Sequence, residues 1–192
     1  MRAVEQAHLL EQLQGVPAQP WLWLSPCASW IPEPVPAGRG MRLSRATDGR
    51  GWQGDVRCGL PLPLPAEAVN AIVLQHAALP DLDMLFSECE RVLMPGGRLW
   101  LTLLNRCSPY RAHWQWRGAR PPSATWCRML LQREGLQCRA VRRLGPLWRT
   151  AAGVGAVPLL RAVCVLEFEK RTLAGLGPEV ARPLGWRKPV AT

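Results

Sequence analysis

The sequence predicts an α/β protein built on a doubly wound, mostly parallel β-sheet. Three observations lead to this prediction: a strand–helix–strand pattern over residues 69–105, a wholly apolar segment Trp21–Leu24 (WLWL) before it, and two strand-like segments near the end of the chain. Buried parallel strands are nearly continuous apolar runs, and a parallel pair needs a crossover connection, usually a helix. The length of 192 residues suits one domain with a sizeable core.

The first half of the chain lacks one helix that such a sheet normally has. Arg2–Gln14 is predicted to be an amphipathic helix that ends near Gly15. Trp21–Leu24 follows as a buried strand, and Gly40–Arg45 is predicted to be the second strand. Between these strands, Ile31–Gly38 carries three prolines in eight residues, which excludes a regular helix. The first crossover helix is therefore predicted to be missing.

The central segment is predicted to be a right-handed parallel βαβ unit. Ala71–Leu74 and Arg98–Leu104 are its two buried strands. Asp81 is placed to cap the intervening helix, and Pro95-Gly96-Gly97 is placed to end it, because proline cannot continue a helix and glycine accepts the left-handed cap. The helix has one apolar stripe at helical spacing, made of Leu82, Leu85, Phe86, Cys89, Val92 and Leu93.

The remaining elements lie on either side of this unit. Trp52–Arg57 is predicted to be the third strand and its exit, and Ser123 is predicted to cap a helix that runs to Glu134. Gln137–Arg143 and Ala162–Phe168 are predicted to be a closing pair of strands. The resulting organisation is an N-terminal helix and lead-in (1–20), a main domain (21–169) and an extended C-terminal tail (170–192).

The net charge of +10 is concentrated in the middle of the chain. Residues 98–149 contain eleven arginines, one acidic residue and five of the ten tryptophans. Guanidinium groups pair with phosphates and indole rings stack on bases, so this region predicts a protein, nucleic-acid or anionic partner. The alternative is a solvated face in a chain that has 22 arginines and 2 lysines. The candidate partner-binding residues are Arg106, Arg111, Trp114, Trp116, Arg117 and Arg120.

The cysteines and the hydropathy exclude several classes of protein. Seven cysteines occur without a CxxC pair or a closely spaced histidine pair, which argues against a zinc site and a disulfide framework and favours reduced, buried thiols. Residues 1–14 lack the apolar segment of a signal peptide, and no apolar run is long enough to span a membrane. The sequence therefore favours a cytoplasmic protein without a metal site.

Four segments resemble one family of enzymes. They are Gly54-Asp55, residues 59–69 (GLPLPLPAEAV), His76–Leu79 and residues 88–99 (ECERVLMPGGRL). Together they resemble the second half of class I S-adenosylmethionine-dependent methyltransferases, in particular small bacterial proteins of the type-11 group. The resemblance covers residues 50–170 well and residues 20–49 poorly. It implies a Rossmann-like, seven-stranded sheet with an antiparallel C-terminal hairpin, and S-adenosylmethionine as the cofactor.

The resemblance also implies roles for individual residues. Asp55 matches an acid that contacts adenine, with Val56 packing on the ring; the alternative is that Asp55 caps a loop. Asp48 lies three residues after Arg45, near the place of an acid that binds the ribose. His76 follows a buried strand, and acts either as a catalytic general base or as a packed, hydrogen-bonded residue. The predicted cofactor-binding residues are Ser25, Asp48, Asp55, Val56, Gln75, His76 and Leu79.

The glycine-rich turn that follows the first strand in this family has no counterpart here. Ser25–Ser29 contains no glycine, although glycine is what lets the backbone approach the cofactor closely. This difference predicts weak or absent cofactor binding. Two functions stay open: methyl transfer from S-adenosylmethionine to an unknown acceptor, and a non-catalytic module, a pseudoenzyme, that binds a partner through its arginine- and tryptophan-rich region.

Overall fold

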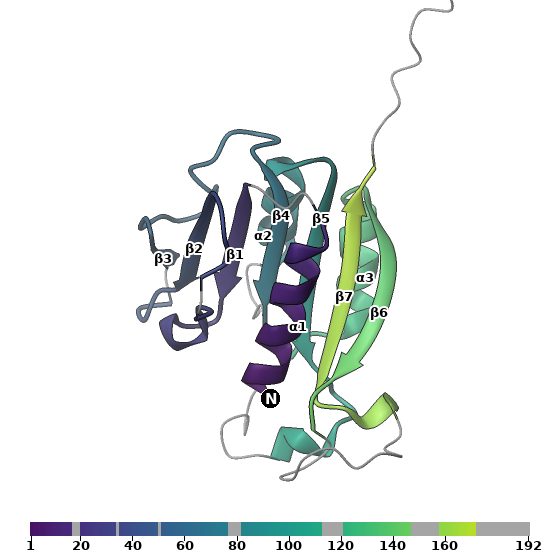
Figure 1. Cartoon of the computed structure of the whole chain (residues 1–192). Coiled ribbons are helices and arrows are strands. Elements are labelled where there is room, and N and C mark those ends of the chain that lie inside the picture. The colour runs from purple at the N-terminus through teal and green to yellow at the C-terminus, as the bar shows by residue number, and fades with distance from the viewer. Residues whose placement is uncertain are drawn as a thin grey trace, which may run out of the picture.

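The computed structural model describes residues 1–16, 20–33, 35–49, 51–76, 82–112, 121–146 and 158–171. Seven strands form one mixed sheet in the order β3-β2-β1-β4-β5-β7-β6 (Figure 1). The strands are β1 (Trp21–Ser25), β2 (Gly40–Arg45), β3 (Trp52–Gly54), β4 (Val69–Gln75), β5 (Leu93–Leu104), β6 (Leu136–Leu144) and β7 (Val163–Lys170). The helices are α1 (Arg2–Gln14), α2 (Leu82–Val92) and α3 (Ala124–Arg133), and the short 3₁₀ turns are η1 (Ala28–Trp30), η2 (Pro109–Ala112) and η4 (Pro158–Leu160).

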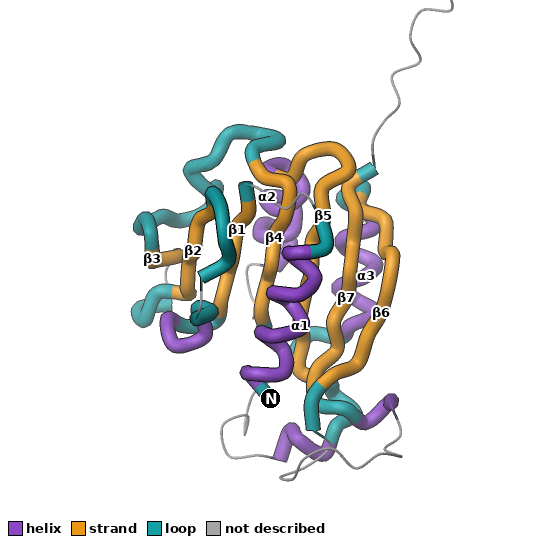
Figure 2. The backbone as a smooth tube through the Cα atoms, in the orientation of Figure 1, coloured by secondary structure: helices purple, strands orange, loops and turns teal. Residues whose placement is uncertain are grey.

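Helices cover both faces of the sheet, which confirms the predicted α/β layers (Figure 2). On one face, α2 and α3 bury Phe86 and Leu131 in the larger core cluster. On the other face, α1 buries Leu9 and Leu13 in a second cluster with Trp23 and Trp100. Between β1 and β2 the described residues contain only η1, so the predicted loss of the first crossover helix is confirmed for them.

The central βαβ unit is confirmed, with one difference at its second turn. β4 and β5 are parallel, and five residues of the predicted apolar stripe are buried within α2. The sixth, Leu93, already belongs to β5 and pairs with Val69. The next register pair is Ala71 with Arg98, so the segment with Pro95-Gly96-Gly97 forms a bulge inside the strand, where Gly96 has φ +77°. The helix therefore ends before the turn that was predicted to stop it.

The predicted third strand and its exit are present, and the strand runs antiparallel to its neighbour β2. β3 has three residues and pairs antiparallel with β2, with Leu43 opposite Gly54. The connection between them is a tight turn in which the backbone N–H of Ala46 donates to the carbonyl oxygen of Gly51. A connection this short cannot carry the chain back for a parallel strand, so it reverses direction. In the sheet as a whole, β3 and β7 are antiparallel to the other five strands.

The closing hairpin is confirmed, because β7 pairs antiparallel with both β5 and β6. α3 begins after Ser123, as predicted, although the Ser123 side chain makes no capping hydrogen bond. In the described part of the chain, no helix has the length and apolar character needed to cross a membrane. Several predictions lie outside the described residues: Leu79, Asp81, the tail from residue 172, and four partner-binding candidates, Trp114, Trp116, Arg117 and Arg120.

Candidate functional site

The carboxyl ends of β1 and β4 lie side by side at the centre of the sheet. From this point the chain leaves in opposite directions, since β1 leads to β2 on one side and β4 leads to β5 on the other. Open α/β sheets bind ligands at such a switch point, where diverging connections leave a crevice. The N-terminus of α1 lies at this same edge of the sheet (Figure 1).

A cavity of about 530 Å³ occupies this edge. Its size lies within the range of small-molecule sites, which is roughly 300–1,000 Å³. The wall comes from three parts of the chain: the start of α1, the segment that follows β1, and η2, which follows β5. The lining residues are Met1, Arg2, Pro26, Cys27, Ser29, Trp30 and Tyr110.

The first turn of α1 is bonded to the segment that follows β1. The guanidinium of Arg2 donates a hydrogen bond to the backbone carbonyl of Ser29. One turn later, Gln6 Nε2 donates to the backbone carbonyl of Trp30 over 2.7 Å. These two bonds close one side of the cavity with a helix and a 3₁₀ turn that are 24 or more residues apart in sequence.

A buried polar network lies at the strand ends, centred on Glu5 of α1. Glu5 is 0% exposed, and its carboxylate accepts hydrogen bonds from Gln75 Nε2 at 2.9 Å and Thr102 Oγ1 at 2.6 Å. His76 Nε2 lies 2.9 Å from its other oxygen. Trp23 Nε1 extends the network by donating to Gln75 Oε1 over 2.9 Å. One carboxylate thereby joins α1 to the ends of β4 and β5.

The charge of Glu5 is stabilised by these partners. Burial alone would raise the pKa of this carboxyl group, but the field of His76 and the hydrogen bonds from His76, Thr102 and Gln75 oppose burial, and the net pKa lies below its ordinary value. His76 also contacts the cavity wall, because the ring of Trp30 meets its imidazole edge-on with 4.9 Å between centroids. The network therefore touches the cavity through His76 and Trp30.

Comparison with known proteins places this arrangement in a fold family. No family model matches the sequence, and no curated protein matches it. Solved structures do match. A Thermotoga maritima S-adenosylmethionine-dependent methyltransferase, described as a possible histamine N-methyltransferase, superposes with a TM-score of 0.58 at 14% identity, over 88% of this chain and 91% of that chain. The Burkholderia thailandensis 1,6-didemethyltoxoflavin-N1-methyltransferase, solved with S-adenosylhomocysteine, gives 0.55 at 10% identity, over 88% and 77%.

The chain has the class I methyltransferase fold. Identities this low show the architecture and not the reaction. A [4+2]-cyclase, SpnF, matches equally well, with a TM-score of 0.57 at 14% identity over 87% of this chain and 81% of that chain. The predicted fold is therefore confirmed, while the activity has to be argued from the site.

The methyltransferase-type sheet brings three of the predicted site residues together. Ser25, Gln75 and His76 all lie at the switch point, at the ends of β1 and β4. Their polar groups bond inside the protein: Ser25 Oγ lies 3.1 Å from the carbonyl of Cys27, while Gln75 and His76 bond to Glu5. Among the described residues, none of these three lines the cavity.

Three other predicted residues lie toward β3, at the edge of the sheet. Asp55 sits opposite Arg42, in the middle of β2, and its carboxylate accepts three hydrogen bonds from the backbone and guanidinium of that residue at 2.8 to 3.3 Å. The side-chain bond from Arg42 is the main reason that the pKa of Asp55 lies below its ordinary value. Asp48 pairs with Arg57 at 3.3 Å, and Val56 is 37% exposed. The structure does not bring these residues to the cavity, and their cofactor-binding roles stay predictions.

Sequence reasoning missed Arg2 and Glu5, which organise the site. A usable signal was present for Glu5, because positions 5, 9 and 13 are four residues apart and lie on the buried face of α1. An acid on the same stripe as Leu9 and Leu13 indicates a carboxylate with buried partners. Among the described residues, no three histidine, cysteine or acidic side chains gather in a way that could hold a metal ion.

Proposed function

We propose that this protein is an S-adenosylmethionine-dependent methyltransferase that binds its cofactor in the cavity at the carboxyl ends of β1 and β4. The observation that supports this most directly is the position of the cavity, at the switch point of a methyltransferase-type sheet. The methyl acceptor is unidentified.

The groups in the cavity suit the chemical parts of this cofactor. S-adenosylmethionine carries a carboxylate, a sulfonium cation and a planar adenine. Arg2 supplies a guanidinium, which has donors to spare after its bond to Ser29 and pairs well with carboxylates. Trp30 and Tyr110 supply aromatic faces, which attract cations and stack on planar rings. The lining therefore contains side chains of the types that bind the groups of this cofactor. The glycine turn of the family is replaced by Ser25–Ser29 and η1.

The bound cofactor would supply an activated methyl group, and the protein would contribute position. Holding the acceptor in line with the methyl group accelerates transfer without proton chemistry at the protein. The predicted role of His76 as general base is the more demanding alternative, because only 4% of its side chain is exposed and Trp30 covers it. We therefore assign catalysis to positioning by the cavity wall, with His76 supporting Trp30.

Calorimetric titration with S-adenosylmethionine and S-adenosylhomocysteine tests this proposal. We expect saturable one-to-one binding in the high-micromolar range, weakened about tenfold by Arg2→Ala through loss of a charge-assisted hydrogen bond. Arg128→Ala is the matched control, because Arg128 is exposed on α3 and away from the cavity lining. Low-micromolar binding would contradict the weak affinity predicted from the missing glycine turn, and no saturable binding would overturn methyl transfer.

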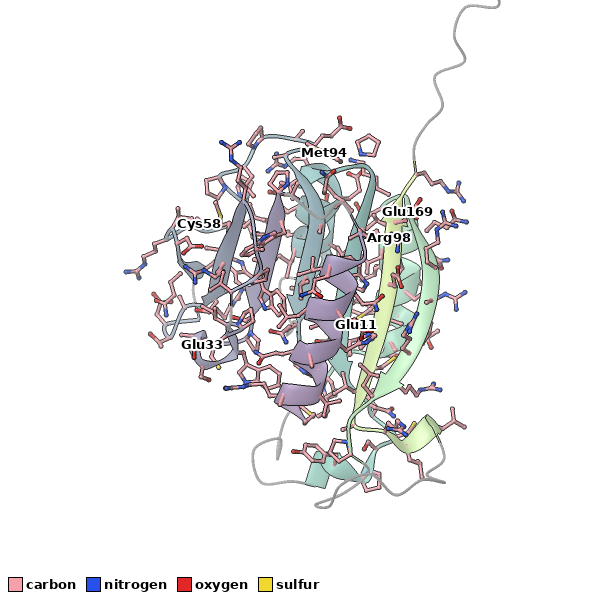
Figure 3. All side chains as sticks on the ribbon, in the orientation of Figure 1. Glu11, Glu33, Cys58, Met94, Arg98 and Glu169 are labelled. Atoms are coloured by element: carbon pink, nitrogen blue, oxygen red, sulfur yellow. The ribbon has the colours of Figure 1, made fainter. Side chains whose placement is uncertain are left out.

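A second candidate function is a non-catalytic module that binds nucleic acid. Residues 121–146 contain five arginines and one acidic residue. Arg139 is bonded to Glu169, but the other four are exposed and form no ion pair among the described residues. Figure 3 shows nitrogen-tipped side chains along the outer side of β6, the edge strand. The four exposed arginines are Arg128 and Arg133 of α3 and Arg142 and Arg143 of β6.

A gel-shift assay with duplex DNA and RNA at low salt tests the module. We expect Arg142→Glu with Arg143→Glu to weaken binding at least tenfold, because phosphate neutralisation dominates such affinity. Arg39→Glu with Arg57→Glu is the control, since it changes the net charge equally at the β2–β3 side of the sheet. Equal losses of affinity in both variants would show that the net charge, and not the position of Arg142 and Arg143, determines binding. If the protein binds only anionic vesicles, or binds nothing at low salt, the proposal of a nucleic-acid-binding module is wrong.

A further inference from the structure

We infer that Glu5 is a positioning residue that builds the ligand cavity. Through its carboxylate it holds the first turn of α1 on the strand ends and keeps His76 against Trp30. The identity of the ligand rests on the proposed function, whereas the effect on α1 does not.

The two halves of α1 are held by different forces. Leu9 and Leu13 in the second half are buried in an apolar cluster with Trp23 and Trp100. In the first half, Val4 is 51% exposed, and Glu5 is the buried residue. The first turn carries Met1 and Arg2, which line the cavity. Its position relative to the sheet is set by the buried polar contacts of Glu5, together with the packing of Met1 on the same apolar cluster and the bonds from Arg2 and Gln6 to η1.

The part of the wall that η1 contributes depends on the same carboxylate. Trp30 is held from two sides, because its ring packs on His76 and its carbonyl accepts the hydrogen bond from Gln6 of α1. Glu5 contributes to both restraints: it bonds His76 Nε2, and it docks the helical turn that carries Gln6. Weakening Glu5 would loosen Arg2 and Trp30 together.

The backbone at His76 also indicates a site held by its surroundings. His76 has φ +44°, a left-handed conformation that residues other than glycine rarely adopt. Such a conformation persists only where neighbouring contacts determine it. Here the backbone N–H of His76 donates to the carbonyl of Thr102 over 2.9 Å, and the imidazole bonds Glu5. The fixed backbone aims the ring at Trp30.

Attaching a helix through a buried carboxylate costs desolvation free energy, whereas an apolar residue would pack there without this cost. The advantage of the carboxylate is geometric. Three directional hydrogen bonds from Gln75, His76 and Thr102 are satisfied together in only one placement of the helix. In this placement, Arg2 lines the cavity and bonds to Ser29.

The test compares Glu5→Gln with Glu11→Gln, an equal change at an exposed position of the same helix. In Glu5→Gln, we expect backbone amides 5–8 to exchange with solvent about tenfold faster, and amides 9–14 to keep most of their protection. The affinity for S-adenosylhomocysteine should fall about tenfold in the same variant. Glu11→Gln should change neither quantity. Thr102→Val, which removes one donor to the carboxylate, should reproduce both effects at smaller size.

The outcomes separate this inference from the proposed function. If the native protein binds no S-adenosylhomocysteine, the proposed function fails, and amide exchange still tests the role of Glu5. If ligand binds but neither Glu5→Gln nor Thr102→Val alters the first turn or the affinity, the positioning role is overturned. If all of α1 loses protection evenly, Glu5 contributes general stability, and the positioning role is also overturned. If Glu5→Gln does not fold, amide exchange and ligand affinity measured on Thr102→Val decide whether the positioning role holds.

Discussion

Glu5 accepts all three of its hydrogen bonds only as a carboxylate, which makes its contribution to folding depend on pH. Its pKa lies below the ordinary value of 4.5 despite complete burial, because His76, Thr102 and Gln75 outweigh the cost of desolvation. A carboxyl whose folded pKa is lowered stabilises the protein above its unfolded pKa, and this contribution is lost as the pH falls through the lower folded value. We therefore expect the difference in unfolding free energy between the native protein and Glu5→Gln to shrink as the pH falls below about 5. Urea titrations of both proteins from pH 7 to pH 3 measure this difference, and Glu11→Gln gives the baseline. A difference that stays the same over the whole range would show that the ionisation of Glu5 contributes nothing.

At the scale of elements, the sequence predicted a helix or strand correctly where its apolar pattern is compatible with a single structure. α1 spans the predicted residues, and the stripe of α2 is buried as expected because helical spacing leaves a single way to bury it. The direction of β3 was not predictable from apolar pattern, since a strand has the same alternation in either direction; only the length of the connection after β2 decides it. The bulge around Gly96 was mistaken for a turn because proline and glycine disrupt helices and strands alike.

At the site, the sequence pattern located the strand ends but not the contacts between segments that are distant in sequence. Ser25, Gln75 and His76 lie at the ends of strands that the sequence predicted, and the structure brings these strand ends together at the switch point. The hydrogen bonds of Gln75 and His76 were not foreseeable, since their partner, Glu5, comes from a helix that is 70 or more residues away in sequence. Asp55 was assigned by resemblance alone, and its bonding to Arg42 depends on the reversal of β3.

At the scale of the whole molecule, all seven cysteines are free thiols, and the three that are buried as predicted report how the core opens. Cys89 of α2, Cys127 of α3 and Cys164 of β7 belong to one apolar cluster on one face of the sheet. Burial raises the pKa of both Cys89 and Cys127 to about 12, so these thiols stay unreactive until the core is exposed.

Because the two helices and β7 share this cluster, we expect its three cysteines to react with a thiol reagent at one common rate, equal to that of global unfolding. The exposed Cys27 and Cys107 should react at once, which provides an internal control. Mass spectrometry of labelled peptides across a urea series measures each rate. Labelling of Cys127 ahead of Cys89 would show instead that α3 opens separately, and that the sheet does not unfold as a single cooperative unit.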